Sequence, residues 1–256
     1  MEKHIIGRGI LAGALAGVLA FVWAKIFLEP IIGRAIQFEE RQSAAHEAME
    51  AAAGHSHGHG DSVELFTRGV QSNIGMGFGV LAFAVAMGAL FAVVFCVAYN
   101  RVNGLSVRAL SALIAGAMLI ALWVVPALKY APNPPATSLE ETITQRGLLY
   151  LLMVGLSALL MVAAGYLGTQ LAPRLGAWNA ALAAAAAYIV AVGVVMLVLP
   201  AIHETPSGFP PEDLYEFRLY SLGTQVVIWA TIGLVFGVLA TRLLEGRRVQ
   251  QDRLTA

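Results

Sequence analysis

Six stretches of the chain are apolar along nearly their whole length, and charged residues are almost confined to the segments between them. Each stretch has the roughly 20 residues that an α-helix needs to cross the hydrocarbon core of a bilayer. The sequence therefore predicts transmembrane helices at Ile5–Leu28, Gly75–Tyr99, Val107–Val125, Gly147–Leu167, Ala177–Leu199 and Ser221–Leu244.

The composition agrees with this pattern. Hydrophobic residues make up 58% of the chain and charged residues 12%, whereas about a quarter of a soluble domain is charged. The six spans leave no room for a separate soluble domain, so we expect one all-α transmembrane domain over residues 1–256. The first stretch is longer than a signal-peptide core, so we expect it to remain as a helix. Cys96 is the only cysteine, which excludes an intrachain disulfide.

The charges predict an orientation. Six spans place both termini on one side of the membrane, together with the short connections Asn100–Ser106 and Gly168–Gly176, which contain arginine and no acid. Positive charge in short loops marks the cytoplasmic face. The opposite face is acidic and carries a long polar loop at about residues 29–74. We therefore expect both termini in the cytoplasm and the histidine-bearing loop outside, and we take the bacterial cytoplasmic (inner) membrane as the default location.

The chain also repeats a pattern of helix, proline, polar loop, acid, arginine and helix. The arginines lie 78 and 72 residues apart, and the pattern indicates three similar two-helix hairpins. Its members are Pro30, Glu64 and Arg68, then Pro126, Glu141 and Arg146, then Pro200, Glu216 and Arg218. An alternative stays open, because proline commonly ends a helix and arginine commonly anchors one at the membrane boundary.

Two sets of glycines recur at a spacing of four residues and so share one face of a helix. Gly9, Gly13 and Gly17 lie in the first predicted span, and Gly233 and Gly237 lie in the last. Small residues at this spacing let two membrane helices approach closely. We therefore expect both faces to contact a neighbouring helix.

The strongest candidate for chemistry is the segment Gly54–Asp61, in which His55, His57 and His59 alternate with glycine and serine. Neutral imidazole is a common ligand for transition metals, and a flexible segment suits weak, exchangeable capture. Asp61 and His46 could add ligands. A solvated linker without a metal remains the alternative. A second group could form a path at the outer mouth: Glu29, Glu64, Arg68, Glu141, Arg146, His203, Glu204 and Arg218.

The order of several short motifs resembles the CbtA family of predicted cobalt-transporter subunits. These motifs are Leu28-Glu29-Pro30-Ile31-Ile32, Leu199-Pro200-Ala201-Ile202, Phe209-Pro210, Phe217-Arg218 and Ser221-Leu222-Gly223. The resemblance covers nearly the whole chain and implies cobalt uptake linked to cobalamin synthesis. It also implies a small, single-span, histidine-bearing partner similar to CbtB. The family is often described with five spans, whereas six are counted here, so the number stays open between five and six.

Two functions are compatible with these features. The first is a metal uptake subunit, whose histidines and outer acids collect a divalent cation, cobalt by resemblance, that the helices pass inward. The alternative is a membrane-anchored metal sensor or donor that does not itself transport. We do not expect an enzyme, since the chain has no HExxH motif. We expect no tightly bound cofactor, membrane lipid as the surroundings, and no nucleic-acid partner, and a homo-oligomer stays open.

Overall fold

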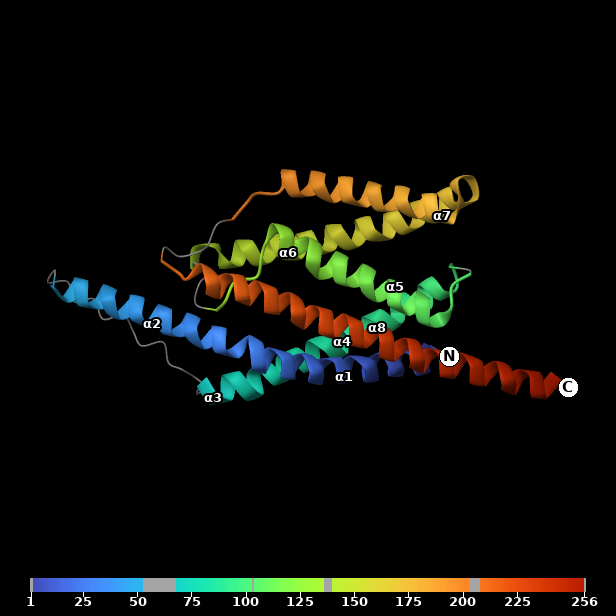
Figure 1. The fold of residues 1–256 in the computed structure, drawn as a ribbon, viewed down its shortest axis with the longest axis horizontal. Helices are drawn as coiled ribbons and strands as arrows, with labels where there is room; N and C mark the ends of the chain where they lie inside the picture. Colours follow the sequence, from blue (N-terminus) through green and yellow to red (C-terminus); the bar gives the residue numbers. More distant parts are fainter. Residues whose placement is uncertain (1, 53–67, 103, 136–139, 203–207, 256) are drawn as a thin grey trace.

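The computed structural model describes residues 2–52, 68–102, 104–135, 140–202 and 208–255, and this part of the chain contains helices and no strand (Figure 1). The elements are α1 (Glu2–Phe27), α2 (Glu29–Ala52), α3 (Arg68–Val70), the π-helix η1 (Gln71–Gly75), α4 (Met76–Tyr99), α5 (Val107–Leu119), the π-helix η2 (Ile120–Val124), α6 (Val125–Lys129), α7 (Glu140–Val198) and α8 (Pro211–Thr255). The predicted all-α membrane architecture is confirmed.

Four helices form the main core. α1 packs against both α4 and α8, and α5 packs on the other side of α8. The largest buried cluster lies among these helices, and within it Phe236 meets Phe91 and Phe95 edge-to-face at centroid distances of 5.1 and 4.9 Å. The inner faces are otherwise lined largely by alanine, which allows the helices to lie close together.

The two predicted glycine faces are confirmed as contact surfaces. A Cβ atom added at Gly13 would overlap the carbonyl oxygen of Ala84, so α1 and α4 touch through their backbones. A Cβ at Gly233 would meet Ala115 of α5 at 2.6 Å. On the same face, the Ser111 hydroxyl donates a 2.6 Å hydrogen bond to the Gly233 carbonyl.

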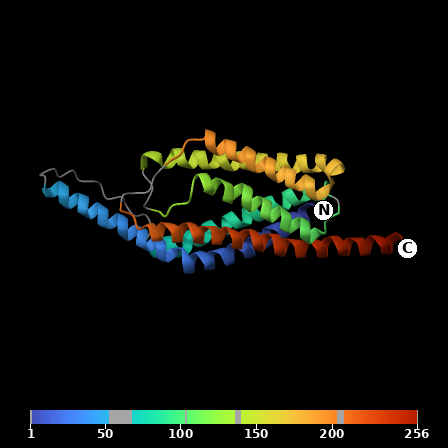
Figure 2. The same cartoon turned by 45° about the horizontal axis from the view of Figure 1, so that its top comes forward.

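α7 folds back on itself at Gly176. Within the described residues, five helices are long and apolar enough to span a bilayer, and the one at Ile143–Val198 has 56 residues, or about 84 Å of helix, nearly three bilayer cores. Gly176 breaks it with φ 76° and ψ 159°, a conformation open essentially to glycine alone. Residues 140–175 and 177–198 therefore lie side by side (Figures 1 and 2). Counted as separate helices, the two halves of α7 raise the number of long apolar segments from five to six, and both numbers agree with the expected five or six spans.

The packing differs from three equal hairpins. The first predicted pair, α1 and α4, does pack together. The third pair, residues 177–198 with α8, does not form a major contact in the described structure, because residues 177–198 pack on the first half of α7. Ser157 and Tyr188 join those halves with a buried 2.7 Å hydrogen bond. α7 in turn meets the rest of the molecule mainly at α6 and η2.

Two prolines predicted to end helices instead lie near a helix start. Pro30 follows Glu29 in the first turn of α2. The N–H groups of a first turn have no carbonyl partner within the helix, so a proline there costs no hydrogen bond. Pro126 occupies the first turn of α6, and the π-turn η2 just before it widens the helix, so the helical run from Val107 reaches Lys129. Pro200, by contrast, follows the end of α7 as predicted. The predicted connection Gly168–Gly176 is also helical up to Gly176.

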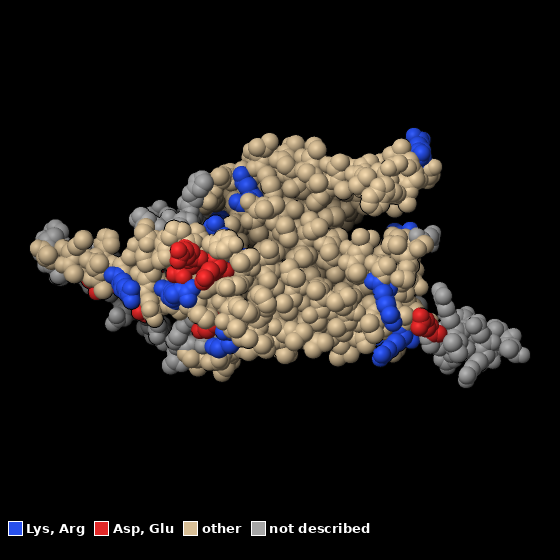
Figure 3. Space-filling view, viewed as in Figure 1, with Lys and Arg blue, Asp and Glu red and all other residues tan. Residues whose placement is uncertain are grey.

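The two ends of the bundle are distinct. Both termini lie toward one end, and α2 projects from the other (Figure 1). Figure 3 shows charged side chains gathered at the two ends of the long axis, with a broad uncharged band between them. This band is the part of the surface that suits the hydrocarbon core of a bilayer.

Candidate functional site

The predicted outer loop at about residues 29–74 is helical over much of its length. α2 covers Glu29–Ala52, and α3 and η1 cover Arg68–Gly75. His55, His57, His59, Asp61 and Glu64 lie outside the described residues. The structure therefore defines the two helices that carry the histidine segment, and the geometry of those side chains stays a prediction.

The base of α2 is fixed to the start of α8. The Arg34 guanidinium bonds to the Asp213 carboxylate at 2.6 Å and to the Glu216 carboxylate at 2.9 Å. Phe38 of α2 meets Phe209 edge-on, with ring centroids 5.2 Å apart. We refer to this contact set as the α2 clasp. Sequence reasoning missed it because Arg34 and Asp213 are 179 positions apart and nothing local links them.

Beyond the clasp, α2 is exposed. His46 lies on this exposed part, as do Glu39, Glu40 and Glu47. Partial burial raises the pKa of the Glu39 carboxyl, and the neighbouring charge of Glu40 raises it further. At a given mildly acidic pH, Glu39 therefore offers less negative charge to a cation than an ordinary glutamate would.

One of the three predicted acid–arginine pairs, Glu216 with Arg218, is arranged differently from expectation. Glu216 pairs with Arg34, whereas Arg218 donates to the Pro132 carbonyl at 3.3 Å and to the Asn133 side-chain oxygen at 3.0 Å. Arg146 donates to the adjacent carbonyl of Ala131. Two of the three predicted arginines thus meet at one short segment, residues 131–133. Guanidinium groups donate hydrogen bonds and carry no lone pair for a metal.

The remaining candidates of the outer mouth are only partly described. Glu29 is half-buried in the first turn of α2, and Arg68 and Glu141 lie in the first turns of α3 and α7. His203 and Glu204 lie outside the described residues. The structure therefore brings Arg146 and Arg218 together, pairs Glu216 with Arg34, and leaves the predicted pairs Glu64–Arg68 and Glu141–Arg146 untested.

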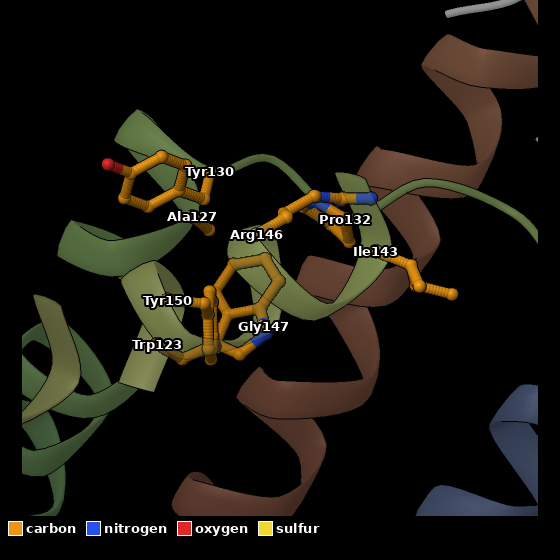
Figure 4. A pocket seen from close by; sticks show the side chains of 8 residues that line it. All are labelled: Trp123, Ala127, Tyr130, Pro132, Ile143, Arg146, Gly147 and Tyr150. Carbon is orange, nitrogen blue, oxygen red and sulfur yellow. The ribbon is translucent and has the colours of Figure 1, made fainter. Parts of the chain in front are cut away.

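A cavity of about 280 Å³ lies beside residues 131–133, between α6 and the start of α7 (Figure 4). Its lining is largely aromatic and apolar, with the Arg146 side chain at its edge. Tyr130 at its wall donates a 2.8 Å hydrogen bond to the Pro200 carbonyl. Burial raises the pKa of the Tyr130 hydroxyl, which therefore stays protonated as a donor. The lining residues are Trp123, Ala127, Tyr130, Pro132, Ile143, Arg146, Gly147 and Tyr150.

The described part of the chain holds no group of three His, Cys, Asp or Glu side chains that could bind a metal. Its buried hydroxyl side chains Ser111, Ser157 and Thr224 each make a hydrogen bond within the protein. The buried indole N–H of Trp229 has no hydrogen-bond partner among the described residues, but it is a donor and cannot bind a metal. No described helix therefore offers a ready set of ligands at the centre of the membrane.

These features define a multi-pass α-helical membrane protein with a polar helix projecting from one end. The sequence matches the family of probable cobalt transporter subunits, CbtA, over residues 2–241. Because this match covers nearly the whole chain, the protein belongs to that family, which confirms the resemblance seen in the sequence. A transporter-subunit family also indicates a non-enzymatic role. No significant match was found among curated proteins or solved structures.

Proposed function

We propose that this protein is the membrane subunit of a transition-metal uptake system, with cobalt as the expected cation. His55, His57 and His59 would capture the ion outside, with Asp61 and His46 as further ligands. The observation that carries the proposal is membership of a cobalt transporter family by a chain whose histidine-rich segment follows a projecting helix. We place the protein in the bacterial inner membrane with cytoplasmic termini, because arginine gathers in the connections at that end.

The arrangement of α2 supports capture at a distance from the membrane. Its 24 residues form a rod about 36 Å long, and the clasp holds its base while its far half is exposed. The chain continues from Ala52 at the free end directly into the histidine segment. His46 lies on the same exposed half, two turns before that end. An ion would therefore be collected in solution and returned toward the acidic outer face.

Passage across the bilayer is the less complete part of the mechanism. A divalent cation needs oxygen, nitrogen or water ligands throughout its path. The described core contains alanine and aromatic side chains, and its few buried hydroxyls are already bonded. We propose that a second subunit completes the path, and the small CbtB-like partner expected from the family fits this role. A homo-oligomer is the other arrangement that would add helices to the path.

The same observation favours one alternative function. A chain that captures metal but has no polar path of its own could serve as a membrane-anchored sensor or donor. The two functions differ in whether metal enters the cell. The alternative predicts metal binding by the purified protein without uptake in any combination of subunits.

The test is cobalt accumulation in cells that lack their own uptake system, with and without the partner. In the triple variant His55→Ala, His57→Ala, His59→Ala, cobalt uptake should be lower than in the wild type at low external cobalt. Uptake should return to the wild-type rate at high cobalt, because capture limits the rate only when metal is scarce. His4→Ala is the control, since His4 is exposed at the opposite end of the molecule. Absence of uptake in every combination, with metal still bound to the purified chain, would establish the sensor or donor function instead.

A further inference from the structure

The cavity between α6 and α7 combines three aromatic rings with one cation. Trp123, Tyr130 and Tyr150 supply the rings, and the Arg146 guanidinium lies at the edge (Figure 4). Apolar walls with a single charged group at the rim suit a ligand that has an apolar body and an anionic head. A hydrated metal cation has the opposite character and would be repelled by Arg146.

A second positive charge lies close by. Arg218 reaches residues 132 and 133 from α8, while Arg146 reaches residue 131 from α7. The hydrogen bonds of Arg218 to residues 132 and 133 go to neutral oxygens, and Arg146 is close enough to interact with its charge. The two guanidinium groups therefore lie around one short segment that offers them neutral oxygens. Guanidinium binds phosphate more strongly than it binds neutral oxygens.

The cavity lies where two apolar spans meet their connecting segment, a position at which lipid headgroups are expected. The apolar span that precedes it ends at Lys129, and the one that follows begins at Ile143. Tyrosine and tryptophan typically occupy this boundary. Ile143 in the cavity wall and Leu148 next to Gly147 are 55% and 64% exposed, so the opening is flanked by an apolar surface that would face the bilayer.

We propose that this cavity binds the phosphate group of an anionic phospholipid. Arg146 donates to the phosphate, and Arg218, which bonds to residues 132 and 133, adds positive charge nearby. Trp123 and Tyr150 contact the glycerol and the first carbons of an acyl chain. A soluble phosphate ester has the same anionic group without the apolar body, and the aromatic walls favour the lipid over it.

The position of the site gives the lipid a structural role. α7 meets the rest of the described bundle mainly at α6 and η2, and the cavity lies at that junction. A lipid bound there contacts Trp123 of η2 and Tyr150 of α7 at once. Its binding should therefore hold the α7 hairpin against the core. This role is independent of metal capture.

The test uses the full-length protein in a neutral detergent, with lipid binding followed by native mass spectrometry and by thermal unfolding. Phosphatidylglycerol should bind and raise the unfolding temperature more than zwitterionic phosphatidylcholine. Gly147→Leu should weaken phosphatidylglycerol binding about tenfold by filling the cavity, and Arg146→Gln should do so by removing a charged donor. A Cβ at Gly147 meets no atom within 4 Å, so Gly147→Leu should fold normally.

Matched controls isolate the cavity from general effects. Gly155→Leu adds the same side chain to the same helix, again in open space but away from the cavity. Arg101→Gln removes an exposed arginine just beyond the end of α4. Its guanidinium donates a hydrogen bond to the Val97 carbonyl in the last turn of that helix. Both controls should bind phosphatidylglycerol as the wild type does.

Three results would overturn the proposal. One is unchanged phosphatidylglycerol binding in both Gly147→Leu and Arg146→Gln. Another is an equal loss of binding in Gly155→Leu or Arg101→Gln, which would indicate general surface effects. The third is competition by glycerol phosphate or inorganic phosphate at concentrations comparable to those of the lipid, which would identify a site for soluble anions.

Discussion

At the scale of single residues, the contact between α1 and α4 depends on four glycines without side chains, Gly9, Gly13 and Gly17 of α1 and Gly88 of α4. Gly13→Ala places a methyl group against the Ala84 carbonyl, and the helices must move apart. We expect Gly13→Ala to lower the free energy of unfolding by about 1–3 kcal/mol, the usual range for overpacking. In the same helix, the methyl group of Gly7→Ala meets no atom within 4 Å. Its higher helix propensity should raise the free energy of unfolding by up to about 1 kcal/mol. Thermal unfolding in one detergent measures both.

Equal unfolding temperatures for the two variants would contradict this packing.

The glycine contact could be predicted because a spacing of four residues is a local property of a helix. The α2 clasp could not, because Arg34, Asp213 and Glu216 come together only through the packing of α2 on α8. The same limit applies to Arg218, which was expected to act beside Glu216 and instead bonds to residues 132 and 133.

At the scale of elements, the clasp should set the direction of α2. Arg34 is about half exposed, so the ion pairs add little stability, on the order of 1 kcal/mol or less. Their effect should appear in orientation instead. Arg34→Gln should broaden the distance distribution between spin labels at Met49 and Tyr215, two exposed positions. The labels are attached through cysteines in a Cys96→Ser background.

Arg41→Gln is the matched control, because Arg41 lies on the exposed part of α2 beyond the clasp. An unchanged distribution in Arg34→Gln, or equal broadening in both variants, would show that the clasp does not orient the helix. In that case the continuous connection of α1 to α2 at Leu28 would be the better explanation for the direction of α2.

The elements themselves were predictable because apolar length is a direct requirement of the bilayer. The ends of the helices were harder to predict. Pro30 and Pro126 were expected to end helices, yet proline is also favoured in the first turn, and a π-turn accommodates the second one. The pairing of the helices was the hardest feature to predict, because every apolar helix face can pack on any other. Residues 177–198 accordingly pack on the first half of α7 and not on α8.

At the scale of the whole molecule, six crossings require that both termini lie on one side and that Gly176 lie on the same side. Five crossings would place the termini on opposite sides. In the Cys96→Ser background, Met49→Cys should react with a membrane-impermeant thiol reagent added outside spheroplasts. Asn179→Cys, three residues beyond the Gly176 turn, should react only after permeabilisation. Reaction of Asn179→Cys from outside would place that turn on the outer face, and α7 could not then cross twice in the arrangement described.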